Sequence, residues 1–172
     1  MPLLPFAGFT IDSPLPPARA AAELASNVEP RRLIRFRRGA AAFEGEVTES
    51  GVDIRRLPGY QNSFLPEIRG SFERTPHGSR LRGTMRMHPL VIVFMCVWMT
   101  FTLIAALAMA AASLSAEKAD PAALIPLAML FFGWALPTAA FTIEAAIARG
   151  ALTGILAREI PSGVRTTAGP RP

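Results

Sequence analysis

The chain has 172 residues, of which 51% are hydrophobic and 18% charged, and its formal net charge is +5. This length predicts one domain with at most an appendage. The charges are unevenly placed: residues 1–88 hold thirteen of the eighteen Lys and Arg and nine of the thirteen Asp and Glu, a local net charge of +4. The single cysteine, Cys96, excludes an intramolecular disulfide and any cysteine-based metal site.

The first thirty residues favour a strand followed by a helix. Apolar and polar side chains alternate over residues 6–11, which is typical of a strand. Asp12-Ser13-Pro14 is a helix-entry signal, and a helix is expected from Pro16 to Asn27 with Ala20 and Leu24 on one side. Small residues on that side would let the helix lie close to a sheet.

An arginine-rich segment follows, with Leu33, Ile34 and Phe36 set among five arginines. One interpretation is a surface strand whose arginines face water. The other is a basic strand facing anionic phospholipid headgroups. Nucleic acid is not expected as a partner, because no recognition module or interleaved aromatic pattern is present. The arginines form a candidate interaction patch: Arg31, Arg32, Arg35, Arg37 and Arg38.

From residue 43 onward, apolar and polar side chains alternate in four segments, which predicts antiparallel strands with one buried face. The segments are 43–48, 52–55, 64–73 and 80–87, with a turn at Pro76-His77-Gly78 between the last two. A single register sets apolar residues opposite apolar ones and glutamates opposite arginines, and a slip of one residue would reverse every side chain. That register pairs Phe72 with Leu81, Ile68 with Met85, Gly70 with Gly83, Glu73 with Arg80 and Glu67 with Arg86.

Two long charge-free runs follow and predict a transmembrane hairpin. Residues 89–114 form a helix of about 40 Å, and residues 121–144 form one of about 35 Å, against roughly 30 Å of bilayer hydrocarbon. The alternative, two buried helices of a soluble core, would need far more surrounding chain than the polar remainder supplies. Glu144 closes the second run and is expected at headgroup level, although an acid inside a membrane span would be a functional candidate.

The end of the chain predicts an amphipathic helix over residues 147–160, with Leu152, Ile155 and Leu156 on one side. This helix could continue the second span, lie on the membrane or pack on the sheet. The tail, residues 161–172, is rich in Gly, Pro and Thr and is expected to be disordered.

Motifs for catalysis are missing from the sequence. The two histidines have no Cys or acid at ligand spacing, no Gly-rich loop leads from a strand to a helix, and no nucleophile elbow is present. No enzyme activity, metal or cofactor is therefore expected.

One polar stretch stands out, Tyr60-Gln-Asn-Ser-Phe-Leu-Pro66, in which Tyr60 and Asn62 join the candidate interaction patch. Here the sequence resembles a family of small, uncharacterised bacterial two-span membrane proteins. In that family a Tyr-x-Asn-Ser-Phe-Leu-Pro segment, a glycine-bearing strand and a strand entering a two-span hairpin recur in this order. The resemblance covers residues 43–147 and implies architecture only. The alternative is a purely structural loop in which Asn62 and Ser63 bond their own backbone.

The expected fold class is α+β: a small antiparallel sheet with one packed helix in residues 1–88, continuous with a transmembrane hairpin in residues 89–146. The function expected is that of a membrane-anchored binding or scaffolding module, and the alternative is an accessory subunit of a transport or envelope-biogenesis assembly. Its partners would be the lipid bilayer and either anionic headgroups or a membrane protein. The expected location is the bacterial inner membrane, as the arginine- and alanine-rich composition indicates and the resemblance implies. Arginines flank the hairpin outside its loop, which favours both termini in the cytoplasm.

Overall fold

A six-stranded sheet and three α-helices make up the protein in a computed structural model that describes residues 6–31, 41–57, 62–114 and 121–157. The helices are α1 (Pro17–Ala25), α2 (Pro89–Leu114) and α3 (Leu124–Leu156), and a 3-10 turn, η1 (Pro121–Ala123), precedes α3. The strands are β1 (Phe6–Ser13), β2 (Val28–Glu29), β3 (Phe43–Val47), β4 (Val52–Arg56), β5 (Glu67–Thr75) and β6 (Gly78–Arg86). The α+β class expected from the sequence is thus confirmed.

The sheet has the strand order β1-β6-β5-β4-β3-β2, which brings the N-terminal strand beside the strand that leads into α2. Every neighbouring pair is antiparallel except β2 and β3, which are parallel. The expectation of a wholly antiparallel sheet is therefore wrong at this one edge. A parallel neighbour needs a connection of roughly a dozen residues, and the thirteen residues between Glu29 and Phe43 meet that need.

The register predicted for the β5–β6 pair is confirmed. Phe72 lies opposite Leu81, Ile68 opposite Met85, Gly70 opposite Gly83, Glu73 opposite Arg80 and Glu67 opposite Arg86. The two glycines meet because the strands come close there: a Cβ at Gly83 would lie 2.3 Å from the carbonyl oxygen of Arg69. A side chain at this point would push β5 and β6 apart.

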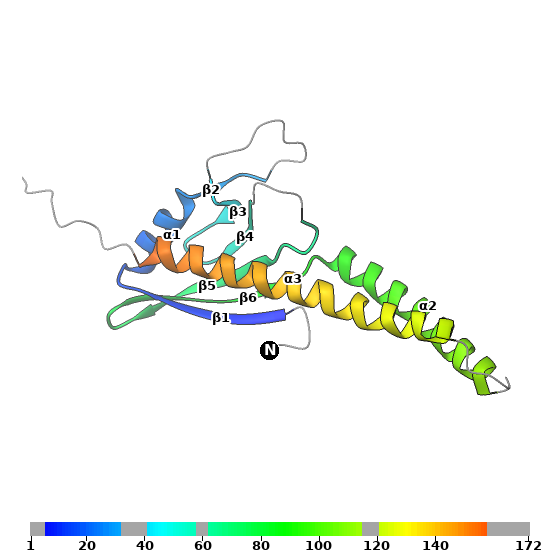
Figure 1. Ribbon diagram of the computed structural model, residues 1–172. Coiled ribbons are helices and arrows are strands. Elements are labelled where there is room, and N and C mark those ends of the chain that lie inside the picture. Colours follow the sequence, from blue (N-terminus) through cyan, green and yellow to red (C-terminus); the bar gives the residue numbers. More distant parts are fainter. Residues whose placement is uncertain (1–5, 32–40, 58–61, 115–120, 158–172) are drawn as a thin grey trace, which may run out of the picture.

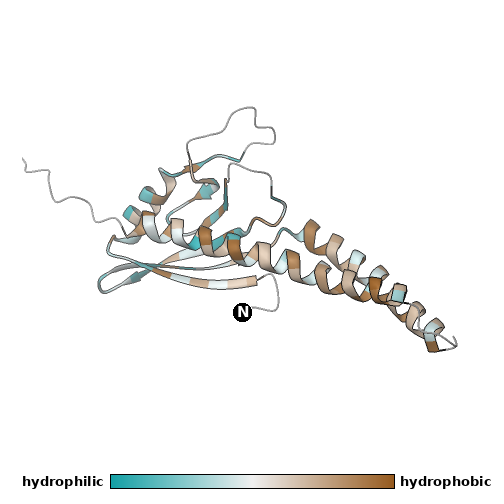
Figure 2. Ribbon diagram, in the orientation of Figure 1, coloured by the Kyte–Doolittle hydropathy of each residue, from teal (hydrophilic) through white to brown (hydrophobic). Residues whose placement is uncertain are grey.

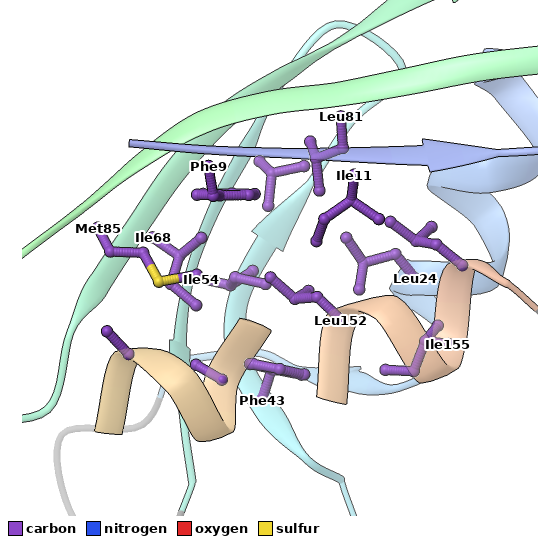
Figure 3. Close-up of a cluster of buried hydrophobic side chains, with 14 of the residues drawn as sticks. Phe9, Ile11, Leu24, Phe43, Ile54, Ile68, Leu81, Met85, Leu152 and Ile155 are labelled. Atoms are coloured by element: carbon purple, nitrogen blue, oxygen red, sulfur yellow. The ribbon is translucent and has the colours of Figure 1, made fainter. Parts of the chain in front are cut away.

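The hydrophobic core lies between one face of the sheet and the second half of α3 (Figures 1 and 3). Inward side chains of five strands and of α1 point toward a stripe on α3 that recurs at intervals of three and four residues. The stripe consists of Phe141, Ala145, Ala148, Leu152, Ile155 and Leu156. At its end the Ser13 hydroxyl donates to the carbonyl oxygen of Leu156 at 2.8 Å, which satisfies one of the free carbonyls of the helix C-terminus.

Helix α1 packs beside α3 on the same face of the sheet. It is shorter than the expected Pro16–Asn27, because it ends at Ala25. Ala20 and Leu24 are fully buried, as the predicted small-residue side requires.

Beyond the sheet, α2 and the first half of α3 run side by side as an extended hairpin, and Figure 2 shows that most residues along it are hydrophobic. Both helices are long and apolar enough to cross a membrane. A core helix of a soluble protein would be mostly buried. Here only 11% of the most apolar window of the α2 span is buried, and only 17% of that of the α3 span.

The C-terminal half of α3 shows which arrangement of residues 147–160 occurs. These residues were expected to form an amphipathic helix after the hairpin of residues 89–146. In the structure α3 continues without a break from Leu124 to Leu156, and its apolar side packs on the sheet. The helix runs through Gly150 because packing of its apolar side outweighs the cost of one glycine, about 1 kcal/mol. Residues 158–160 and the tail, 161–172, lie outside the described residues.

We predict that this second half of α3 is as important for folding as the strands. Leu152→Ala removes a fully buried side chain and should lower the free energy of unfolding by about 2–5 kcal/mol. Thr153→Ala changes the neighbouring exposed residue and should have an effect of about 0.5 kcal/mol or less. Denaturant unfolding of the full chain in detergent measures both. Equal stabilities of the two variants would contradict the observed packing.

Candidate functional site

Glu144 is the one charged residue in α3 between its start and Arg149, and only 3% of it is exposed. The expected side chain that extends outward to the headgroups is not observed, because this side chain is buried inside the protein. Its side chain is buried where α3 meets the sheet, next to Ala145 and one turn from Phe141 and Ala148 of the core stripe. A buried carboxylate requires charged or hydrogen-bonding partners, because its desolvation otherwise costs several kcal/mol.

Those partners come from the end of β4 and from the segment that precedes β5. Arg56 is the last residue of β4, and its Nη2 lies 3.1 Å from Oε2 of Glu144. Asn62 donates from Nδ2 to Oε1 of Glu144 at 2.9 Å. Each carboxylate oxygen thus contacts a different element. We call Arg56, Asn62 and Glu144 the Glu144 cluster.

The local structure around Asn62 explains how its amide reaches α3. Asn62 accepts a hydrogen bond on Oδ1 from the backbone N–H of Phe64 at 2.9 Å, which closes an Asx-type turn. This bond confirms the expectation that Asn62 bonds its own backbone. The turn leaves the amide nitrogen free to point at Glu144, while Pro66 at the end of the segment is buried. The polar motif therefore connects the sheet to the helix as well as forming a turn.

Of the seven residues of the predicted interaction patch, Arg31 and Asn62 lie within the described residues. Arg31 is exposed, and its Nη2 lies 2.6 Å from Oδ1 of Asp53 on β4. Asn62 is partly buried and belongs to the Glu144 cluster. The other members, Arg32, Arg35, Arg37, Arg38 and Tyr60, lie outside the described residues.

The face of the sheet away from α3 carries a ladder of ion pairs between neighbouring strands. Arg69 on β5 contacts Asp53 at 3.1 Å, and Arg80 on β6 contacts Asp12 on β1 at 2.6 Å. The hydrogen bond from Arg80 holds the pKa of Asp12 below its ordinary value and raises the pKa of Arg80. Glu44 is buried and paired with Arg55. We call this surface the outer face.

An apolar hollow of about 230 Å³ lies between α2 and α3 near the sheet. Met95, Cys96 and Met99 line it from α2, and Trp134 and Pro137 from α3. Flexible methionine side chains on such a surface adapt to the shape of what they contact.

Within the described residues no group of three or more His, Cys, Asp or Glu side chains is placed to hold a metal ion. Comparisons with protein-family models, with curated proteins and with solved structures gave no significant match. The functional argument therefore depends on the geometry of this chain.

Sequence reasoning missed the pairing of Arg56 with Glu144, because 88 positions separate the two residues. The available signal was that Glu144 is the single charge in an otherwise apolar run from residue 121 to residue 148. Such a residue calls for a partner, but the partner's identity depends on how α3 crosses the sheet.

We predict that the Glu144 cluster behaves as a buried ion pair. Glu144→Ala removes the carboxylate that Arg56 contacts and should lower the free energy of unfolding by about 3 kcal/mol. Replacing both partners, as in Arg56→Met with Glu144→Met, should recover much of that loss, because no charge then remains buried. A double-mutant cycle of unfolding in detergent measures the coupling.

The matched control is Glu73→Ala, which removes an exposed glutamate that also lies opposite an arginine. It should change stability by about 0.5 kcal/mol or less. Equal effects of Glu73→Ala and Glu144→Ala would show that burial gives the cluster no special role.

Proposed function

We propose that this protein is a membrane-anchored binding or scaffolding module, which holds a small α+β domain in a defined orientation at the membrane surface. The observation that carries the proposal is the continuity of α3. Its first half is apolar and largely exposed, as a lipid-facing helix is, and its second half is the centre of the domain core. A helix that belongs to both parts fixes the orientation of the domain relative to the hairpin. A flexible linker would hold the two together without fixing their orientation.

The second connection between hairpin and domain is equally short. Strand β6 ends at Arg86 and α2 begins at Pro89, so only Met87 and His88 intervene. Met87 is itself buried in the core. The two connections and the Glu144 cluster all hold the domain against the hairpin. The domain therefore has little freedom to rotate relative to the hairpin. The surface presented for binding is then the outer face, which α1 and α3 leave uncovered.

The location that best fits this function is the bacterial inner membrane with the domain in the cytoplasm. Arg80, Arg82 and Arg86 precede α2 and Arg149 follows the apolar part of α3, whereas the loop between the helices has one lysine offset by two acids. Excess arginine favours the cytoplasmic side.

We predict the topology accordingly. In a Cys96→Ser background, a cysteine placed at Ala119 should react with a membrane-impermeant thiol reagent added to intact cells. A cysteine at exposed Ser71 should react only after the inner membrane is opened. The reverse pattern of labelling would overturn the assignment.

The alternative function, an accessory subunit that binds a membrane protein through its hairpin, is favoured by the hollow between α2 and α3. Methionines and a glycine at this hollow would accept a partner helix at close range.

Site-specific crosslinking in the native host distinguishes the two functions. A photoreactive residue at Ser71 on the outer face should give a defined protein adduct if the domain binds, while one at Phe131 on the hairpin should give only lipid adducts. A stoichiometric membrane protein crosslinked from Phe131, with none from Ser71, would establish the alternative. Absence of protein adducts at both positions would contradict both functions.

A further inference from the structure

The end of the outer face nearest the hairpin carries a group of charged side chains that the proposed function does not use. Arg86, at the end of β6, lies opposite Glu67 on β5. Because Met85 and Met87 are buried in the core, strand alternation places Arg86 on the outer face. His88 follows at the start of α2, with its Nε2 3.7 Å from Oε1 of Glu67.

These contacts are loose in comparison with the other ion pairs of the same face. Nε of Arg86 lies 4.0 Å from Oε2 of Glu67; this nitrogen is itself buried and, among the described residues, has no hydrogen-bond partner. Both distances to Glu67 exceed those of a hydrogen bond. The pair Arg80–Asp12, further along the same strand, is at 2.6 Å. Arg86, Glu67 and His88 therefore retain hydrogen-bonding capacity toward a ligand.

The histidine geometry indicates which atom offers a proton. Nδ1 of His88 accepts from the backbone N–H of Leu90 at 3.2 Å. In the neutral ring the proton is then on Nε2, the atom that faces Glu67. Arg86 and His88 both present donors, and Glu67 between them presents an acceptor with negative charge. The side chains of Arg86 and His88 are 40% and 48% exposed, so a ligand reaches these two first, whereas the side chain of Glu67 between them is 12% exposed.

The group formed by Arg86, Glu67 and His88 lies next to exposed apolar side chains at the start of α2. Leu90, two residues after His88, is 71% exposed, and Val93 and Phe94 continue an exposed apolar surface on α2. Phe6, opposite Arg86 on β1, is 52% exposed. If α2 enters hydrocarbon, Arg86, Glu67 and His88 lie at the depth of the lipid headgroups.

We propose that Arg86, His88 and Glu67 bind the headgroup of a phospholipid that carries a primary ammonium. The phosphate lies against Arg86 and His88, the ammonium lies against Glu67, and an acyl chain follows the first turns of α2. Arginine recognises phosphate with two parallel hydrogen bonds, and a carboxylate accepts from an ammonium. The alternation of donor, acceptor and donor matches a zwitterion better than a purely anionic headgroup. The inference depends on the proposed insertion of the hairpin in a bilayer.

The test is lipid retention by the full chain, extracted from nanodiscs that contain equal amounts of phosphatidylethanolamine, phosphatidylcholine and phosphatidylglycerol with identical acyl chains. Native mass spectrometry identifies the retained lipid. The wild-type chain should retain phosphatidylethanolamine at least several-fold over phosphatidylcholine, whose methylated ammonium cannot donate to Glu67. Arg86→Gln and His88→Gln should each reduce retention of phosphatidylethanolamine severalfold, and Glu67→Gln should abolish the preference over phosphatidylcholine.

Arg82→Gln is the matched control. Arg82 lies on the same strand and face, is exposed, and stands about 13 Å further from the start of α2, so the variant makes the same charge change away from the site. It should retain lipid as the wild type does. Loss of retention in Arg82→Gln equal to that in Arg86→Gln would reduce the effect to net charge and overturn the site.

Two further outcomes bear on the inference. Displacement of the lipid by inorganic phosphate alone would show a free-phosphate site and overturn the assignment to a lipid. His88 lies outside the strands, so His88→Gln tests the site even if Arg86→Gln fails to fold. Protection of Cys96, which lies in α2 and is exposed on the protein itself, from a water-soluble thiol reagent in the same nanodiscs reports insertion. An inserted protein without lipid preference would overturn the site and leave the proposed function standing, whereas a protein that fails to insert would overturn both.

Discussion

The structure depends on one helix, α3, whose two halves have different surroundings. For its first four turns or so α3 is exposed and apolar, and from Phe141 onward it carries a single buried stripe that the strands and α1 surround. A helix is a rigid unit with a rise of 1.5 Å per residue, so the depth of the stripe along α3 sets the distance between the sheet and the hairpin. The strands supply most of the core side chains, but the position of the domain relative to the hairpin follows from α3.

A stripe of alanine, leucine and phenylalanine does not by itself select one position. Shifting α3 by one turn, about 5.4 Å, would still set apolar side chains against an apolar sheet face. The Glu144 cluster distinguishes these positions, because a shifted helix would leave Glu144 buried without Arg56 and Asn62. Buried polar groups in helical assemblies are known to specify register at some cost in stability. The cluster therefore selects one docking position, and the hydrophobic stripe supplies the stability.

On the outer face, basic side chains and carboxylates form two kinds of contact, one close and one longer. Away from the hairpin, Arg80 and Asp12 satisfy each other at 2.6 Å, and exposed pairs of this kind keep an edge of the sheet solvated while adding little stability. At the hairpin end, Arg86 and His88 stand further from Glu67 and keep hydrogen-bonding capacity. The two groups differ in their position along β6: Arg80 lies away from the hairpin, whereas Arg86 and His88 lie where α2 starts.

The sequence by itself determined those features that depend on local periodicity. Alternation placed the long strands and the register of β5 and β6, because Phe72, Leu81, Ile68 and Met85 can share a face in only one pairing. The charge-free run placed α2 with its bounds at residues 89 and 114. Only the tertiary structure decided that β2 runs parallel to β3, that α3 continues through Gly150 onto the sheet, and that Glu144 meets Arg56. Each of these depends on contacts between distant segments, whose burial outweighs the local signals of a glycine or an apparent span end.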